Sequence, residues 1–317
     1  MDTCARRRIE GVIVTAVALF WLVPIAGQSE TTTATTKSDP SKTWRTSWGD
    51  PDLQGSWSNA TITPLQRPKQ YGTREFLSPE ELKANTDARA RRAQQQPFVS
   101  YEEFWYERGG FDGRTSLVFD PSDGQIPYTT EGTRRRAAFL KEGFDSWSDR
   151  DLYERCIMRN PLPRVPTAYN NNYELLQTPG YVAILQEIMH DVRVIPLDGR
   201  PHLNPTVRQW LGDSRGHWEG NTLVVETTNF TDRTDFEGAG PNMRLIERWT
   251  RVADDRIDYR FTVEDATAWT RPWSAAIGWN KVEPLFEYAC HEGNRALVHV
   301  LQGARVQEAE KAAKRAN

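Results

Sequence analysis

Residues 244–264 read RLIERWTRVADDRIDYRFTVE, two runs of similar length joined by Ala253-Asp254-Asp255. In the second run, every odd-numbered residue from 257 to 263 is aliphatic or aromatic, and the residues between them are polar. Alternation with a period of two is typical of a β-strand with one buried face. Because a parallel neighbour needs a crossover of about a dozen residues, so short a link predicts an antiparallel pair.

The first run mixes charged and apolar residues on one face, since Glu247 and Arg251 alternate with Leu245 and Trp249. Such a face is either an ion-paired outer surface or one wall of a polar pocket. The sequence leaves both alternatives open. Glu247 and Arg251 are therefore candidate ligand-binding residues.

Further short apolar segments surround this hairpin: residues 173–177, 181–188, 192–197, 216–219, 222–230, 269–279 and 285–290. Turn signals at Thr178-Pro179-Gly180 and Gly220-Asn221 join two pairs of them. The series of about nine strands with short links predicts a mainly β protein. We expect an antiparallel meander that forms a lipocalin-like barrel or a sandwich, because both remove exposed sheet edges.

The remaining segments flank this β domain. Helices are expected over residues 78–96, 131–142 and 149–156, with a short strand over 115–120. The predicted organisation is a signal peptide (1–28), a flexible leader (29–45), a strand and helix extension packed on the barrel (46–165), the β domain (166–303) and a C-terminal helical tail (304–317).

The N-terminus predicts export to the periplasm or secretion. Arg6, Arg7 and Arg8 precede an apolar run over residues 11–27, which is the pattern of a secretory signal. An uncleaved membrane anchor is the alternative, and it would be the protein's only link to a membrane. Removing residues 1–28 takes three of the 40 basic and two of the 43 acidic residues, leaving a net charge near −4 that disfavours nucleic-acid binding.

Two cysteines, Cys156 and Cys290, follow the signal. In an oxidising compartment such a pair predicts a disulfide, which stabilises by about 4–5 kcal/mol for a loop of this length. A catalytic thiol at Cys290, next to His291, is the competing interpretation.

Several long strings resemble an uncharacterised family of exported bacterial proteins. They are YNNNYELLQTPGYVAILQEIMHDVRVIPLDGRPH (169–202), GDSRGHWEGNTLVVETTNFTDRTDF (212–236), RLIERWTR (244–251) and FEYACHEGN (286–294). The stretches PDLQGSWSNATITPLQRP (51–68) and RTSLVFDPSDGQIP (114–127) are similar to the N-terminal half of the same group. The resemblance covers nearly all of the mature chain and implies export, but no catalytic residues. The Gly55-x-Trp57 motif ahead of a β meander is also similar to lipocalin-type barrels, which implies a ligand cavity.

The densest polar cluster runs from Gln186 to His202, at the end of an apolar strand. His190 is the candidate general acid or base, oriented by Asp191 or Glu187, and Arg193 would hold an anionic group. His202 and His291 complete the candidate catalytic set. Because neighbouring residues in a strand face opposite ways, His190 and Asp191 need a turn or bulge to cooperate. The competing interpretation is a surface corner of mutually paired groups.

Aromatic and amide side chains give a second set of candidates: Tyr169, Asn172, Tyr173 and Trp218 could bind a small ligand or a glycan. Most tryptophans in a large β fold are core residues. The scattered histidines lack zinc-ligand spacing, so no metal is expected, and the absence of nucleotide motifs predicts no cofactor.

Together these features predict an exported β-barrel-like protein that binds a small organic ligand. If it is an enzyme, we expect a cofactor-independent hydrolase, lyase or isomerase that uses His190. The alternatives are a non-catalytic ligand- or carbohydrate-binding protein of the cell envelope and a structural envelope protein.

Overall fold

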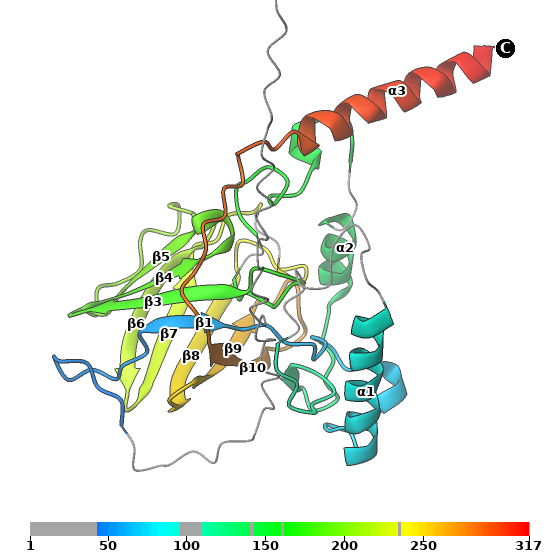
Figure 1. The fold of residues 1–317 in the computed structure, drawn as a ribbon. Helices are drawn as coiled ribbons and strands as arrows, with labels where there is room; N and C mark the ends of the chain where they lie inside the picture. The colour runs from blue at the N-terminus through cyan, green and yellow to red at the C-terminus, as the bar shows by residue number, and fades with distance from the viewer. Residues whose placement is uncertain (1–42, 96–108, 140–142, 160–161, 234–235, 317) are drawn as a thin grey trace, which may run out of the picture. The chain divides into compact units, whose positions relative to one another are not determined.

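The structure is a computed structural model that describes residues 43–95, 109–139, 143–159, 162–233 and 236–316 (Figure 1). The expected signal peptide and most of the leader lie outside these residues. All described residues belong to one compact unit. Ten antiparallel strands form a nearly closed, barrel-shaped sheet, so the predicted mainly β fold is confirmed.

The strands follow one path around the sheet: β5 (Val192–Pro196), β4 (Tyr181–Gln186), β3 (Asn172–Thr178), β1 (Gly55–Ser58), β10 (Trp273–Lys281), β9 (Arg256–Glu264), β8 (Arg244–Ala253), β7 (Thr222–Thr228) and β6 (Asp213–Glu219). A short strand, β2 (Val118–Asp120), also pairs with β10. The single predicted meander is divided into two runs of sequential neighbours, β3–β5 and β6–β10. Strand β1, from the segment expected as an extension, lies between them and joins them.

The barrel closes where β5 approaches β6, through side chains. A Cβ atom on Gly216 of β6 would lie 2.8 Å from Ile195 Cγ2 and 2.7 Å from Leu197 Cδ2. Only glycine leaves room for so close an approach. Arg193 of β5 also donates from Nε to Ser214 Oγ of β6 at 2.8 Å. Side-chain packing and this buried hydrogen bond therefore replace a backbone ladder at the seam.

The core is aromatic and lies inside the barrel. Trp57, Trp249, Trp269, Trp273 and Trp279 are each at most 3% exposed, so five of the tryptophans that the structure describes are core residues. The ring of Tyr173 stacks on Trp279 with a centroid distance of 4.6 Å. Aromatic pairs of this kind add to the stabilisation that burial provides.

Among the described residues, three α-helices lie outside the sheet, and two of them match the predicted ranges closely. Helix α1 (Pro79–Gln95) starts with a capping box, in which Glu81 N donates to Ser78 Oγ at 3.2 Å and Ser78 N donates to Glu81 Oε2 at 2.9 Å. Helix α2 is Thr130–Phe139. Helix α3 (Ala296–Ala316) begins before the predicted tail. Within the described ranges, every helix is too short or too polar to span a bilayer.

Two predicted elements are wrong. Residues 149–156 form turns after a short 3-10 helix, η3 (Trp147–Asp149), because Arg150 is extended and Cys156 has a left-handed φ of 52°. Residues 285–290 run without a strand. Both segments end at the disulfide between Cys156 and Cys290, whose Cα atoms are 5.8 Å apart. The predicted disulfide is therefore confirmed, and it is consistent with an oxidising compartment.

Candidate functional site

The six predicted catalytic residues lie in different surroundings. His190 and His291 are exposed, whereas Arg193 is buried inside the barrel. His202 belongs to an ion-pair network with Asp213. The structure therefore does not gather them around one cavity.

His190 lies in the 3-10 turn η4 (Ile188–His190), which supplies the turn that cooperation with Asp191 would need. The turn is tight, since Met189 and His190 both have a left-handed φ, 65° and 53°. The two neighbours nevertheless have separate partners. His190 Nε2 accepts from the backbone N–H of Tyr288 at 3.4 Å, and Asp191 pairs with Arg164 at 3.3 Å. Burial raises the pKa of the Asp191 carboxyl, and Arg164 offsets part of that rise.

Glu187 and Asn172 meet, but in a structural role. The buried Glu187 carboxylate accepts from Asn172 Nδ2 at 2.6 Å and from Asn170 Nδ2 at 3.0 Å. These bonds tie the start of β3 to the turn after β4. Asn170 and Asn172 thus stabilise the start of β3 and the η4 turn.

Tyr169 belongs to a cluster of phenols beside the disulfide. Its hydroxyl lies 2.9 Å from that of Tyr153, which lies 2.8 Å from that of Tyr288. The Arg159 guanidinium stacks over Tyr153 and Tyr169, at 4.1 and 5.3 Å from their centroids. Burial raises the pKa values of Tyr153 and Tyr169, which keeps both phenols protonated. The cluster fastens the disulfide-linked segments to each other.

His202 forms part of the ion-paired outer surface. Its Nδ1 lies 2.8 Å from Asp213 Oδ2, and its Nε2 lies 3.3 Å from Glu226 Oε1. Glu226 in turn pairs with Arg244. This network matches the surface-corner alternative for the polar cluster.

Trp218 and Arg251 both serve packing. Trp218 packs against the core cluster. The Arg251 guanidinium lies 5.1 Å from the Trp44 ring centroid and 5.5 Å from that of Trp57, and it donates to the backbone carbonyls of Asp52 and Asp254. These contacts fasten the N-terminal segment to the sheet.

The interior of the barrel holds a buried ion pair between Arg193 and Glu247, which are 6% and 1% exposed at their side chains. Arg193 Nη2 donates to Glu247 Oε2 and, at 2.6 Å, to Thr227 Oγ1. Tyr259 donates its hydroxyl to Glu247 Oε1 at 2.9 Å. Burial and the neighbouring Glu247 raise the pKa of Tyr259 well above its ordinary value, so this phenol is a neutral donor. The sequence left two alternatives for the face of residues 245–251, an ion-paired outer surface or one wall of a polar pocket. Glu247 lies in the wall of a polar pocket.

A small cavity surrounds this pair. Its lining residues come from six strands of the sheet and from the 162–164 segment: Leu162, Arg164, Tyr173, Ile184, Gln186, Arg193, Glu247, Trp249, Tyr259 and Trp279. The centre of a water molecule can move through about 20 Å³ of it. Since one water needs roughly 10–15 Å³ on this measure, the cavity has room for one.

Several polar groups around this cavity lack partners among the residues that the structure describes. The Gln186 amide, 3% exposed, makes no side-chain hydrogen bond. The buried indole N–H groups of Trp249 and Trp279 have no acceptor either. Buried polar atoms are nearly always hydrogen-bonded, so such a concentration indicates a place where water or a ligand supplies the missing partners.

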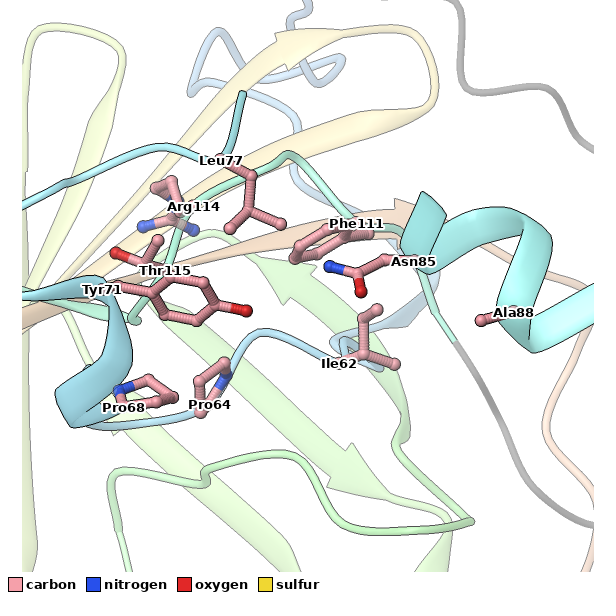
Figure 2. A pocket seen from close by; sticks show the side chains of 10 residues that line it. All are labelled: Ile62, Pro64, Pro68, Tyr71, Leu77, Asn85, Ala88, Phe111, Arg114 and Thr115. Carbon is pink, nitrogen blue, oxygen red and sulfur yellow. The ribbon is translucent and has the colours of Figure 1, made fainter. Parts of the chain in front are cut away.

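A larger hollow of about 270 Å³ lies between helix α1 and the loops around residues 62–77 and 111–115 (Figure 2). Apolar side chains such as Ile62, Leu77 and Phe111 form much of its wall, and the polar lining residues are Tyr71, Asn85, Arg114 and Thr115. Arg114 and Thr115 have hydrogen-bond partners within the protein, and Tyr71 and Asn85 are half-exposed, so solvent can satisfy them without a ligand. The interior cavity is therefore the stronger candidate site.

Comparison with models of known protein families and with curated proteins gives no match for this chain. Among the described residues, no group of three or more histidine, cysteine and acidic side chains could hold a metal ion.

The sequence identified Arg193, Glu247 and Tyr173 as candidates and missed Tyr259, Trp249 and Trp279. It placed Gln186 at the edge of the polar cluster without selecting it. The usable signal was a polar residue on an otherwise apolar face, as Gln186 is beside Val182 and Ile184 of β4.

Proposed function

We propose that this protein is an exported, barrel-type binding protein that holds a small organic ligand in the cavity around Arg193 and Glu247. The observation that carries the proposal is the buried side-chain oxygen of Gln186, which has no hydrogen-bond partner among the described residues. An unsatisfied buried amide lowers stability by about 1–3 kcal/mol. This cost is explained if a bound ligand supplies the hydrogen bond that the amide lacks in the free protein.

A ligand larger than water would enter by displacing the residues that cover the cavity. Leu162 and Arg164 line the cavity but belong to the segment before β3, not to the sheet. The Arg164 side chain is held by Asp191 at 3.3 Å and by the carbonyl of Arg159 at 3.1 Å. Outward displacement of these two side chains would enlarge the cavity without breaking any strand pairing.

We propose binding without catalysis as the activity. The acid–base hypothesis requires His190 at the ligand, but the imidazole is exposed and contacts the backbone of Tyr288. The interior instead offers groups that orient a ligand: a guanidinium, a neutral phenol, an amide and two indoles. The disulfide supports the periplasm or the exterior of the cell as the place of action.

A thermal-shift screen of the oxidised protein against small aromatic and aliphatic compounds tests this function. Gln186→Leu keeps the size of the side chain and removes the amide. Gln302→Leu, at an exposed position of α3, is the matched control. We expect hits to stabilise the wild type and Q302L but not Q186L. Equal stabilisation of Q186L would show that the ligand binds elsewhere.

A further inference from the structure

We infer that the ligand of the interior cavity is a neutral, planar molecule that carries a carbonyl-type oxygen acceptor. The inference rests on the proposed function and adds the chemical class of the ligand. It follows from three properties of the lining: its charge balance, its excess of N–H donors and its aromatic walls.

The charges that line the cavity are already balanced. Arg193 is in contact with Glu247 inside the barrel, and Arg164 at the cover pairs with Asp191. A charged ligand would lose its hydration on entry, and every charged group that lines the cavity is already paired with an opposite charge, so none is left to pair with the ligand. A neutral ligand avoids this penalty.

Donors outnumber acceptors among the groups without partners. Trp249 Nε1 and Trp279 Nε1 each offer a buried N–H without an acceptor. The buried Gln186 Oε1 adds one acceptor, and exchanging the amide oxygen and nitrogen would replace it with a donor, so the excess of donors remains in either orientation. The Glu247 oxygens already accept from Arg193 and Tyr259. A ligand that satisfies this lining must therefore contribute lone pairs.

The walls are flat and aromatic. Tyr173 and Trp279 are stacked at 4.6 Å, and Trp249 lies against Tyr259 with centroids 4.9 Å apart. Rings pack on such surfaces by offset stacking or edge contacts, and this favours a planar ligand over a branched aliphatic one. An aromatic or conjugated carbonyl compound combines the planar shape with the acceptor.

Three probes of similar size separate these properties. Acetophenone is neutral and carries a carbonyl, ethylbenzene has nearly the same shape without an acceptor, and benzoate has acceptors with a negative charge. Calorimetry on the oxidised protein gives their affinities, and spectra of protein labelled with ¹⁵N at the indoles show which N–H groups respond. We expect acetophenone to bind at least about tenfold more tightly than either other probe, equivalent to about 1.4 kcal/mol.

The spectra should locate the effect. Acetophenone should shift the indole N–H signals of Trp249 and Trp279 and leave that of Trp147, which is exposed, unchanged. Trp249→Phe keeps an aromatic ring and removes one donor. It should weaken acetophenone binding severalfold and leave the affinity for ethylbenzene unchanged.

The outcomes distinguish this inference from the proposed function. If benzoate or ethylbenzene binds at the two indoles as tightly as acetophenone, the cavity is a binding site but the inferred ligand class is wrong. If no probe moves either indole signal and the Gln186-dependent screen also yields no ligand, the proposed function fails and the inference fails with it.

Discussion

Replacing Glu247 with Gln should destabilise the protein by about 3 kcal/mol. The change preserves the size of the side chain but leaves the Arg193 charge buried without a counter-charge. Breaking a buried pair by removing one partner costs roughly 3–5 kcal/mol. We expect the lower end, because the new amide oxygen can still accept a hydrogen bond and Arg193 keeps Ser214 and Thr227 as acceptors.

A double variant separates the cost of an isolated charge from the net contribution of the pair. Arg193→Met with Glu247→Leu removes both charges at once, and apolar replacement of a buried pair is often neutral or stabilising. Ser214 and Thr227 keep each other as partners at 3.0 Å, but the Tyr259 hydroxyl loses its acceptor. The double variant should therefore lie within about 2 kcal/mol of the wild type.

Urea unfolding of the oxidised proteins, followed by tryptophan fluorescence, measures these free energies. The matched control is Glu219→Gln, which breaks an exposed pair with Arg248 and should cost at most about 1 kcal/mol. The reasoning is refuted if E247Q is as stable as E219Q, because the pair would then be solvated. It is also refuted if the double variant loses as much as E247Q or more.

Three further predictions concern single features. Opening the disulfide with Cys156→Ser and Cys290→Ser, which are 134 residues apart, should lower the free energy of unfolding by up to about 5 kcal/mol in urea titrations, and an unchanged midpoint would contradict this. Gln186→Leu should raise it by about 1–2 kcal/mol by removing the unpartnered amide, whereas a loss would show that bound water already satisfies this group. Burial raises the pKa of Asp191 above its value in the unfolded chain, so ionisation of this carboxyl opposes folding. Relative to Asp191→Asn, the wild type should therefore gain stability as the pH falls through the raised pKa towards about 4. A stability difference that does not depend on pH would contradict this.

The strands that could be predicted best are those with clean alternation. Strand β9 (Arg256–Glu264) has the bounds that the sequence indicated, and its buried residues are those at odd positions from 257 to 263. Strand β1 could be anticipated only as a motif. Its place between β3 and β10 depends on pairing with residues more than a hundred positions away, and local pattern contains no such information.

Strand β5 shows why the site was harder to predict than the fold. Hydrophobic alternation would turn Val192 and Val194 inward and Arg193 outward, but both valines are 55% exposed and Arg193 is buried. Ile195 packs inside the barrel, and a strand cannot bury Ile195 and Val194 on the same face. The inward position of Arg193 is stabilised by Glu247 on β8, which only the three-dimensional structure brings near.

The same reasoning explains why the polar cluster of residues 186–202 gave a mixed result. Its members are neighbours in sequence, so the alternation of strands and the η4 turn send them to different surfaces: Gln186 and Arg193 inward, His190 and Asp191 to other partners. The interior site gathers residues from β3, β4, β5, β8, β9 and β10, one or two from each. In a barrel, a functional site is therefore better indicated by isolated polar residues on separate apolar faces than by polar residues that are contiguous in the chain. Glu247 is such an isolated polar residue, and the sequence identified it. Gln186 is another, because it is the last residue on the inward, otherwise apolar face of β4.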